Sequence, residues 1–330
     1  MLKTLPFPFP NEKTIRVITD TDAYNECDDQ YAVAHLWMTP KFDNCAMIAE
    51  QYGTMRDENS EQMSYNELQN LAKLMGLDDQ VKILHGAPTA LPDEKTPVDS
   101  EGARFIIEEA LRDDPRPLFI CNLGAVTNLA SAYLLEPKIA DKITVIWIGG
   151  APYPEGGFEF NQNNDLNAAN VLFKSKMKLW QVPSNVYTTM RVSFMELVEK
   201  VYPCGAIGKY LVENTMNFQK LFAQIMPQMV EMILGSSSGS DLAAMASPDP
   251  AEMATSYGGE IWSLGDSPVV GLMLNNMLGD FTIRSAPYQV NPDGTYDLTR
   301  EGSRKIHVYD NIDSRFILND LYAKLHYYFG

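Results

Sequence analysis

The feature that most constrains this 330-residue chain is an alternation of short apolar runs with helical patterns over its first two-thirds. The apolar runs are rich in β-branched residues and do not alternate in polarity, and Ile143–Ile148 (ITVIWI) is almost entirely apolar. Strands of this kind are buried on both faces, as in a parallel sheet flanked by helices. We therefore predict an α/β fold with an open, mostly parallel sheet and helices on both faces. Strands are expected over Thr14–Thr19, Cys45–Ala49, Val81–Leu84, Leu118–Cys121, Ile143–Ile148 and Lys178–Val182, with helices over Asp28–Trp37, Glu61–Met75, Glu101–Leu111, Thr127–Leu135 and Leu166–Lys174.

The last third has a different pattern. After Val192 it is helical and methionine-rich through Leu234, and Gly235–Gly239 (GSSSG) has the composition of a flexible loop. No linker separates the two parts, so we predict a single domain over residues 1–330, with a helical region at about 193–262 as a candidate lid. The remaining expected elements are a helix over Pro268–Leu278, strands near Phe281–Ile283 and Lys305–Val308, and a helix from Arg315.

Composition excludes several classes of protein. The chain has 43 acidic and 26 basic residues, a formal net charge of −17, and such a field repels nucleic-acid phosphates. No apolar run reaches the roughly 18 residues of a membrane span, and Met1–Pro10 lacks the pattern of a signal peptide. The four cysteines are widely spaced and form no CxxC pair, which favours reduced thiols in a cytoplasmic protein over disulfides or a zinc site. They are Cys27, Cys45, Cys121 and Cys204.

An acidic loop follows the first expected strand. The segment Asp20–Asp29 (DTDAYNECDD) carries five carboxylates, which repel one another unless a cation lies among them. Ligands of parallel sheets bind beyond the carboxyl ends of the strands, and Ca²⁺ takes about six to eight oxygen ligands, so the loop favours a calcium site. Two alternatives remain: Asp28 as a helix N-cap in a solvated turn, or a metal-dependent phosphatase with Asp20 as its nucleophile.

Further motifs give the chain a resemblance to a known family. DTDAYNECDD is similar to the opening motif Asp-Thr-Asp-Pro-Gly-x-Asp-Asp of the inosine–uridine-preferring nucleoside hydrolases, with the same two acidic pairs, two additional residues and no Pro-Gly. The other matches follow in the family's order, so the chain resembles this family over most of its length. They are His85–Pro88, Leu123–Ala130, Ile148–Gly150, Glu159–Asn161 with Asp165 and Ala168–Ala169, Val182–Pro183, and Gly265–Pro268.

The resemblance implies a nucleoside hydrolase-like fold, hydrolysis of the N-glycosidic bond of ribonucleosides, and a homodimer or homotetramer. It implies a Ca²⁺ ion at the bottom of the pocket, and Asp22 as the base that accepts a proton from calcium-bound water. The implied metal ligands are Asp22, Asp29, the backbone carbonyl of Thr127, and Asp266. The implied substrate contacts are Asp28 to the ribose hydroxyls, Glu159 and Asn161 to the 5′ side, Gln51 where the family has a sugar-binding Asn, and Asn25 in the enlarged first loop.

The chain departs from the family at the leaving-group side. Many pyrimidine-tolerant members have a histidine directly before the last Asp, as the acid that protonates the departing base, and here that position is Gly265. Trp262 and Tyr257 lie just upstream and are candidates for stacking on a base. We therefore predict a preference for purine nucleosides. The alternatives are a ribosyl-binding relative with altered specificity or no turnover, and the metal-dependent phosphatase.

Overall fold

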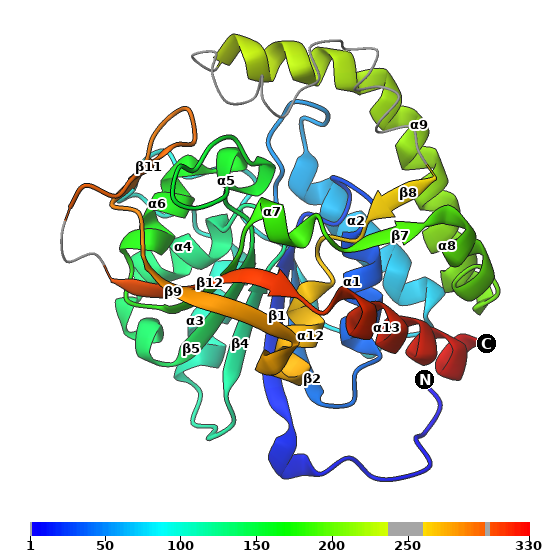
Figure 1. The fold of residues 1–330 in the computed structure, drawn as a ribbon. Helices are drawn as coiled ribbons and strands as arrows, with labels where there is room; N and C mark the ends of the chain where they lie inside the picture. The colour runs from blue at the N-terminus through cyan, green and yellow to red at the C-terminus, as the bar shows by residue number, and fades with distance from the viewer. Residues whose placement is uncertain (1, 237–259, 301–303) are drawn as a thin grey trace.

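The computed structural model describes residues 2–236, 260–300 and 304–330 (Figure 1). Its centre is an eight-stranded sheet in the order β3-β2-β1-β4-β5-β6-β12-β9. Neighbouring strands run parallel except for β9, which pairs antiparallel with β12 at one edge. The expected open, mostly parallel sheet is therefore confirmed. The strands are β1 (Ile15–Thr21), β2 (Phe42–Ala49), β3 (Ile83–Leu84), β4 (Leu118–Asn122), β5 (Ile143–Ile148), β6 (Lys178–Val182), β9 (Gly279–Ser285) and β12 (Lys305–Ile312).

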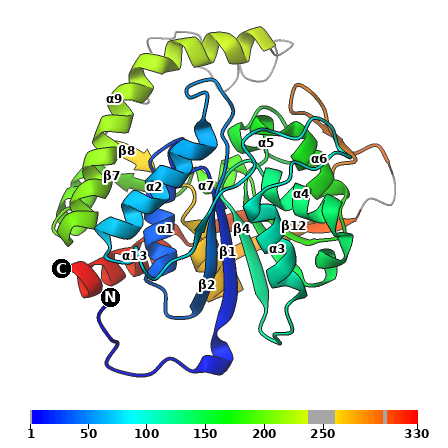
Figure 2. The same ribbon diagram turned by 180° about the vertical axis from the view of Figure 1, so that it is seen from behind.

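Helices cover both faces of the sheet, as Figures 1 and 2 show from opposite sides. Ile146 and Ile148 of β5 belong to one buried apolar cluster, together with side chains of α1, α2, α12 and α13. Val145 and Trp147 belong to a second cluster with α3, α4 and α6. The apolar character of this strand on both sides thus follows from burial on both sides. The helices are α1 (Asp29–Trp37), α2 (Ser60–Leu74), α3 (Glu101–Leu111), α4 (Thr127–Leu135), α5 (Phe160–Asn164), α6 (Leu166–Lys174), α7 (Ser184–Tyr187), α8 (Phe194–Lys200), α9 (Gly205–Ser236), α12 (Pro268–Leu274) and α13 (Ser314–Phe329).

Several helix ends are set by local hydrogen bonds. Asp28 is the N-cap of α1, because its carboxylate accepts from the Asp29 backbone N–H, and Ser100 caps α3 by accepting from the Ala103 backbone N–H. The helix expected to reach Leu278 ends at Leu274 instead, since Asn275 adopts an extended backbone and caps a short 3₁₀ turn. The capping alternative for Asp28 is therefore realised, although in a buried loop and not in a solvated turn.

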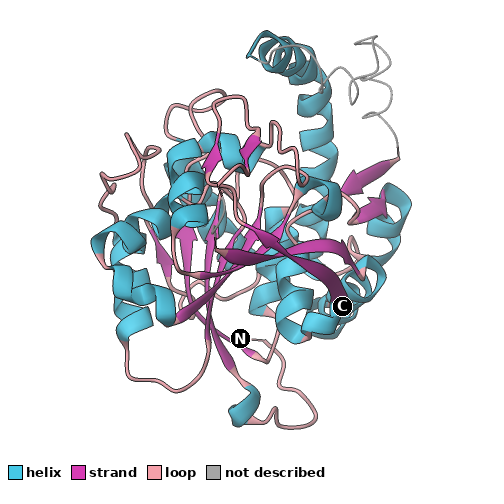
Figure 3. Cartoon of the chain, turned by 60° about the vertical axis from the view of Figure 1, so that its left-hand side comes forward, coloured by secondary structure: helices cyan, strands magenta, loops and turns pink. Residues whose placement is uncertain are grey.

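The candidate lid region, about 193–262, contains α8, α9 and one strand of a small antiparallel pair. That pair is β7 (Arg191–Ser193) with β8 (Ile261–Ser263), and a second pair joins β10 (Gln289–Val290) to β11 (Tyr296–Asp297). α9 contacts α2 and α13 and extends beyond the sheet (Figure 3). Tyr257 and residues 237–239 of the GSSSG segment lie outside the described residues. None of the helices that the structure describes is long and apolar enough to cross a membrane.

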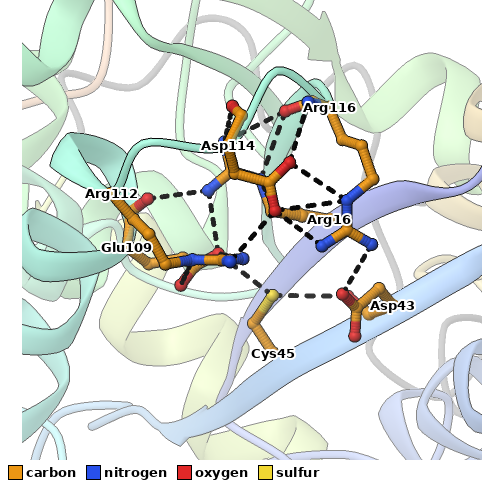
Figure 4. A network of polar contacts seen from close by, with 7 residues as sticks. All are labelled: Arg16, Asp43, Cys45, Glu109, Arg112, Asp114 and Arg116. Atoms are coloured by element: carbon orange, nitrogen blue, oxygen red, sulfur yellow. Dashed lines mark hydrogen bonds and ion pairs between the residues drawn. The ribbon is translucent and has the colours of Figure 1, made fainter.

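A polar network stabilises the opposite end of the sheet, where β1, β2 and β4 begin (Figure 4). The buried guanidinium of Arg16 donates to the side chain and the backbone carbonyl of Glu109, both at 2.8 Å, and to the carbonyls of Asp114 and Arg116. The Cys45 thiol lies 3.4 Å from Glu109 Oε1, and its burial, together with that carboxylate, raises the pKa of Cys45 to about 12. This cysteine is therefore a poor nucleophile.

We predict that Arg16→Met lowers the free energy of unfolding by about 3 kcal/mol, because breaking a buried ion pair leaves the remaining partner poorly solvated. Arg104→Met is the matched control, since Arg104 pairs with Asp99 on the exposed surface and should change stability by less than about 1 kcal/mol. Urea unfolding curves measure both. Equal losses in the two variants would contradict the role assigned to the network.

Candidate active site

A pocket lies beyond the carboxyl ends of β1, β2, β4 and β5, the edge at which ligands bind in parallel sheets. It encloses about 860 Å³, counted with the open solvent at its mouth. Its wall combines carboxylates, amides and aromatic rings. The lining residues are Asp22, Asn25, Glu26, Asp28, Asp29, Tyr52, Met55, Arg56, Leu123, Ile148, Glu159, Phe160, Asn161, Asn164, Tyr187, Phe218, Phe222 and Asp266.

Three carboxylates converge at the buried centre of this pocket. One oxygen each of Asp28, Asp29 and Asp266 lies within 4.8 Å of the others. The first two come from the β1–α1 loop and the third from the segment before α12, so the fold joins residues more than 230 positions apart. Burial raises the pKa of Asp28 to about 6, against several backbone N–H bonds that lower it. Burial and then the neighbouring carboxylates raise the pKa of Asp29 and Asp266 well above the usual value. A divalent cation with oxygen ligands would relieve this repulsion.

Asp22 lies in the same pocket but outside the group of three. Its Oδ2 accepts from Asn25 Nδ2 at 2.9 Å, and burial, followed by repulsion from Asp28, raises its pKa to about 7. Glu50, at the end of β2, is buried nearby. A Cβ added at Gly124 would lie 2.9 Å from both Asp22 Cγ and Glu50 Oε2. The glycine therefore provides the space in which the two carboxylates approach the β4–α4 loop.

Three residues that the sequence assigns to the site do not line the pocket, namely Thr127, Gln51 and Trp262. The Thr127 hydroxyl donates to Asp165 at 2.8 Å, and its backbone N–H donates to Glu50 at 3.0 Å. The Gln51 side-chain amide donates to the Thr127 hydroxyl, and its oxygen accepts from the backbone N–H of Gly53. Leu123, four residues before Thr127 and directly after β4, lines the pocket instead. Of these two residues after β4, Leu123 is therefore the one that lines the pocket.

Glu159 and Asn161 both line the pocket, on the loop and first turn of α5. The Glu159 carboxylate accepts from the backbone N–H groups of Gly150, Asn161 and Gln162, and from the Tyr187 hydroxyl at 2.9 Å. Asn161 Nδ2 donates at 2.9 Å to the carbonyls of Leu123 and Ile148. Because its N–H groups are used in this way, Asn161 has its side-chain oxygen available for a ligand. No sequence motif singles out Tyr187, which lies on the short helix α7 after β6.

The aromatic side of the pocket is built from other residues than those expected. Trp262 is buried in β8 and is not among the lining residues; it packs edge-on against Phe218 and Phe222, at 5.8 and 5.6 Å between ring centroids. These two phenylalanines of α9 form the pocket wall, so Trp262 supports it from behind. Tyr257 lies outside the residues that the structure describes.

Gly265 is the position at which the family resemblance would lead us to expect a histidine, and a side chain here would be tightly confined. A Cβ at this position would lie 3.0 Å from the Tyr187 ring and 3.1 Å from Asp28 Oδ2. None of the four histidines lines the pocket. His35 contacts Asp320, His85 contacts Glu61, and His307 stacks on Phe281. The described part of the pocket therefore contains no imidazole acid.

Asp20 is unsuited to the nucleophilic role that a phosphatase would require. Its two oxygens accept from the side-chain amides of Asn122 and Asn128, each at 3.0 Å, and it does not line the pocket. Burial raises the pKa of Asp20 to about 8, which disfavours the ionised form that a nucleophile needs. We therefore reject the phosphatase alternative.

This fold and site define an α/β protein with an acidic pocket at the carboxyl edge of a mostly parallel sheet, the edge at which such folds bind ligands. More narrowly, the chain belongs to the inosine-uridine preferring nucleoside hydrolase family, whose model matches residues 17–314. The inosine-uridine preferring nucleoside hydrolase of Crithidia fasciculata is 34% identical over 99 residues, which cover 28% of this chain and 30% of that relative. The matched stretch thus spans less than a third of that protein.

Solved structures share the fold over nearly the whole chain. A plant nucleoside hydrolase superposes with a TM-score of 0.71 at 18% identity, covering 94% of this chain and 98% of that one. A purine-preferring ribonucleoside hydrolase from Gardnerella vaginalis gives a TM-score of 0.70 at 18% identity, with the same two coverages. At these identities the likeness establishes the common fold.

We predict that Gly124→Ala reduces turnover of the substrate by about 100-fold, since moving a catalytic group by about 1 Å can have an effect of this size. The added methyl group would displace Asp22 or Glu50, while the outer surface of the protein stays unchanged. Steady-state kinetics and a melting curve test this together. Full activity in the alanine variant would show that the position of Asp22 is not critical.

Proposed function

We propose that this protein hydrolyses the N-glycosidic bond of ribonucleosides, with Ca²⁺ as cofactor and Asp22 as the base. The observation that carries the proposal is the convergence of Asp28, Asp29 and Asp266 beside Asp22 in one buried pocket. Membership of the nucleoside hydrolase family supports it. The oxygen-only donor set and its excess negative charge fit calcium in particular.

As the family resemblance implies, the residues that would hold the cation are Asp22, Asp29, Asp266 and a backbone carbonyl, for which we propose Leu123 in place of Thr127. Asp29 and Asp266 converge with Asp28, and Asp22 lines the same pocket outside that group. When bound, calcium would lower the pKa of a water molecule in the pocket. Asp22 would accept the proton of that water, and the bond from Asn25 orients its carboxylate for this role.

The remaining polar groups would hold the sugar. Asp28 would accept hydrogen bonds from ribose hydroxyls, because a carboxylate forms strong charge-assisted bonds with such donors. The side-chain oxygen of Asn161 and the Glu159–Tyr187 pair would contact the 5′ side. Asn25, from the enlarged loop, would lie against the sugar next to Asp22. Gln51 supports this site indirectly through Thr127.

We further propose that purine nucleosides are preferred. Phe218 and Phe222 offer a broad aromatic wall for a purine, and the described pocket lacks a histidine to protonate a pyrimidine. Trp262 would act through these rings and not by direct stacking. The cytoplasmic location and the homodimer or homotetramer remain predictions, as do the single domain and the lid.

We predict that Asp22→Asn lowers turnover of inosine by a factor of about 10³ or more, since the amide cannot accept the proton and general base catalysis contributes about 10²–10⁴. Release of ribose from inosine, measured as reducing sugar, is the assay, with uridine as the comparison substrate. Asp78→Asn removes an exposed carboxylate and is the matched control. Wild-type turnover by Asp22→Asn would exclude Asp22 as the base, and absence of ribose release by the wild type would favour a ribosyl-binding relative.

We predict that calcium raises the melting temperature, and more so at pH 8 than at pH 5. Asp22 and Asp28 have folded-state pKa values of about 7 and about 6, above their ordinary value of 3.8. A raised pKa favours folding below the unfolded-state value, and this contribution is lost as the pH rises through the folded-state value. The metal-free protein should therefore lose stability between about pH 4 and pH 8, and calcium should restore it, by about 2.7 kcal/mol at a hundredfold excess over Kd.

Thermal melts with chelator, Ca²⁺ and Mg²⁺ at both pH values test the metal site. Mg²⁺ should stabilise less, because it demands a near-octahedral site and loses its water reluctantly. Melting curves that are the same with chelator and with calcium would count against the site.

A further inference from the structure

Arg56 is the one cationic side chain among the residues that line the described pocket, which also include six carboxylates. It lies in the β2–α2 loop, and its side chain is 22% exposed. No sequence motif singles it out. Its position in a pocket of opposite charge calls for a functional explanation.

The guanidinium is held in place by both loops that border it. Nε donates to Asp57 at 3.0 Å, Nη1 to the Asn25 carbonyl at 2.6 Å, and Nη2 to the Tyr24 carbonyl and, at 3.4 Å, to the Tyr52 hydroxyl. These bonds hold the enlarged β1–α1 loop against the β2–α2 loop. A guanidinium has five N–H donors, and no bond to a described residue uses the second N–H of Nη1.

The surroundings of Arg56 are those of a base-binding site. Its guanidinium carbon lies 5.1 Å from the ring centroid of Tyr52, 5.5 Å from that of Tyr24 and 5.9 Å from that of Phe218. Tyr52 and Phe218 line the pocket, and Phe222 lies one turn further along α9. Among the described residues, its bonds do not include Asp22, Asp28, Asp29 or Asp266, which mark the sugar and metal end.

We propose that Arg56 is a specificity-determining residue that donates a hydrogen bond to an oxo group on the leaving base, so that 6-oxopurine nucleosides are the preferred substrates. The proposal rests on the proposed function. In the reaction, the water oxygen bonds to C1′, the C1′–N bond breaks, and its electron pair stays on the base. One proton of the water goes to Asp22 and is released to solvent, from which a base nitrogen takes up a proton; Arg56 stays protonated throughout.

This assignment has a physical reason beyond ground-state binding. The negative charge that develops on a departing 6-oxopurine spreads onto its carbonyl oxygen. A charged N–H bond to that oxygen strengthens as the charge grows, and therefore stabilises the transition state more than the substrate. Arginine suits the role because it remains charged at every working pH.

The test compares Arg56→Gln and Arg56→Lys with the wild type on inosine, which has the 6-oxo group, and on purine riboside, which lacks it. Arg56→Gln should lower kcat/KM for inosine by about 100-fold, as removal of one such donor does, and for purine riboside by less than threefold, roughly the scatter of single contacts. Arg56→Lys should recover part of the loss on inosine. Arg104→Gln, at an exposed ion pair, is the control and should match the wild type on both substrates.

Equal losses on both substrates would overturn the inference, because they would show that Arg56 only supports the loops. Failure of the proposed function is recognised separately, as absence of ribose release by the wild type on either substrate. In that case, calorimetric measurement of the binding of the free bases tests the contact between Arg56 and the oxo group. Tighter binding of hypoxanthine than of purine by the wild type, lost in Arg56→Gln, would support the oxo-group contact, and equal binding by the two proteins would overturn it.

Discussion

The structure depends on the confinement of mutually repelling carboxylates in one buried site. Asp28, Asp29 and Asp266 lie within 4.8 Å of one another, and Asp22 adds a further charge. The fold lowers part of this repulsion with aligned dipoles: Asp28 and Asp29 stand at the N-terminus of α1, and Asp266 lies just before α12. Helix N-termini favour negative charge, but their partial charges are smaller than the charge they oppose. The repulsion that the helix dipoles do not offset is what a bound cation would neutralise.

The sheet and the position of the acidic pocket could be predicted from the sequence because both depend on local patterns. The apolar run of β5 indicates burial on both faces, and a parallel sheet directs the ends of β1, β2, β4 and β5 to one edge. Asp22, Asp28 and Asp29 follow the first of these strands directly. Asp266 is further away, and it was found only because its motif resembles that of the family. The sequence around Asp266 alone does not distinguish it from the N-cap of a helix.

The parts that the sequence could not supply depend on distances within loops. Thr127 and Leu123 are both in the loop–helix segment after β4, and the backbone path decides which of them faces the pocket. The same holds for Trp262: an aromatic residue near Asp266 is a reasonable candidate for stacking, but α9 inserts Phe218 and Phe222 in front of it. Tyr187 and Arg56 come from segments without any motif. Their roles arise from contacts with Glu159 and with the enlarged first loop, which only the tertiary structure defines.

Gly265 connects these observations. Tyr187 and Asp28 fill the space where relatives place a histidine, at 3.0 and 3.1 Å from a Cβ at this position, so a substitution here would disturb the residue that we assign to the ribose. Tyr187 in turn donates to Glu159, which accepts four hydrogen bonds and to which we assign the 5′ side of the ribose. The two additional residues of the first loop bring Asn25 to Asp22 and bring the Tyr24 and Asn25 carbonyls to Arg56. This is consistent with our proposal that help for the leaving group comes from another side of the pocket, where Arg56 is the cation among the described lining residues.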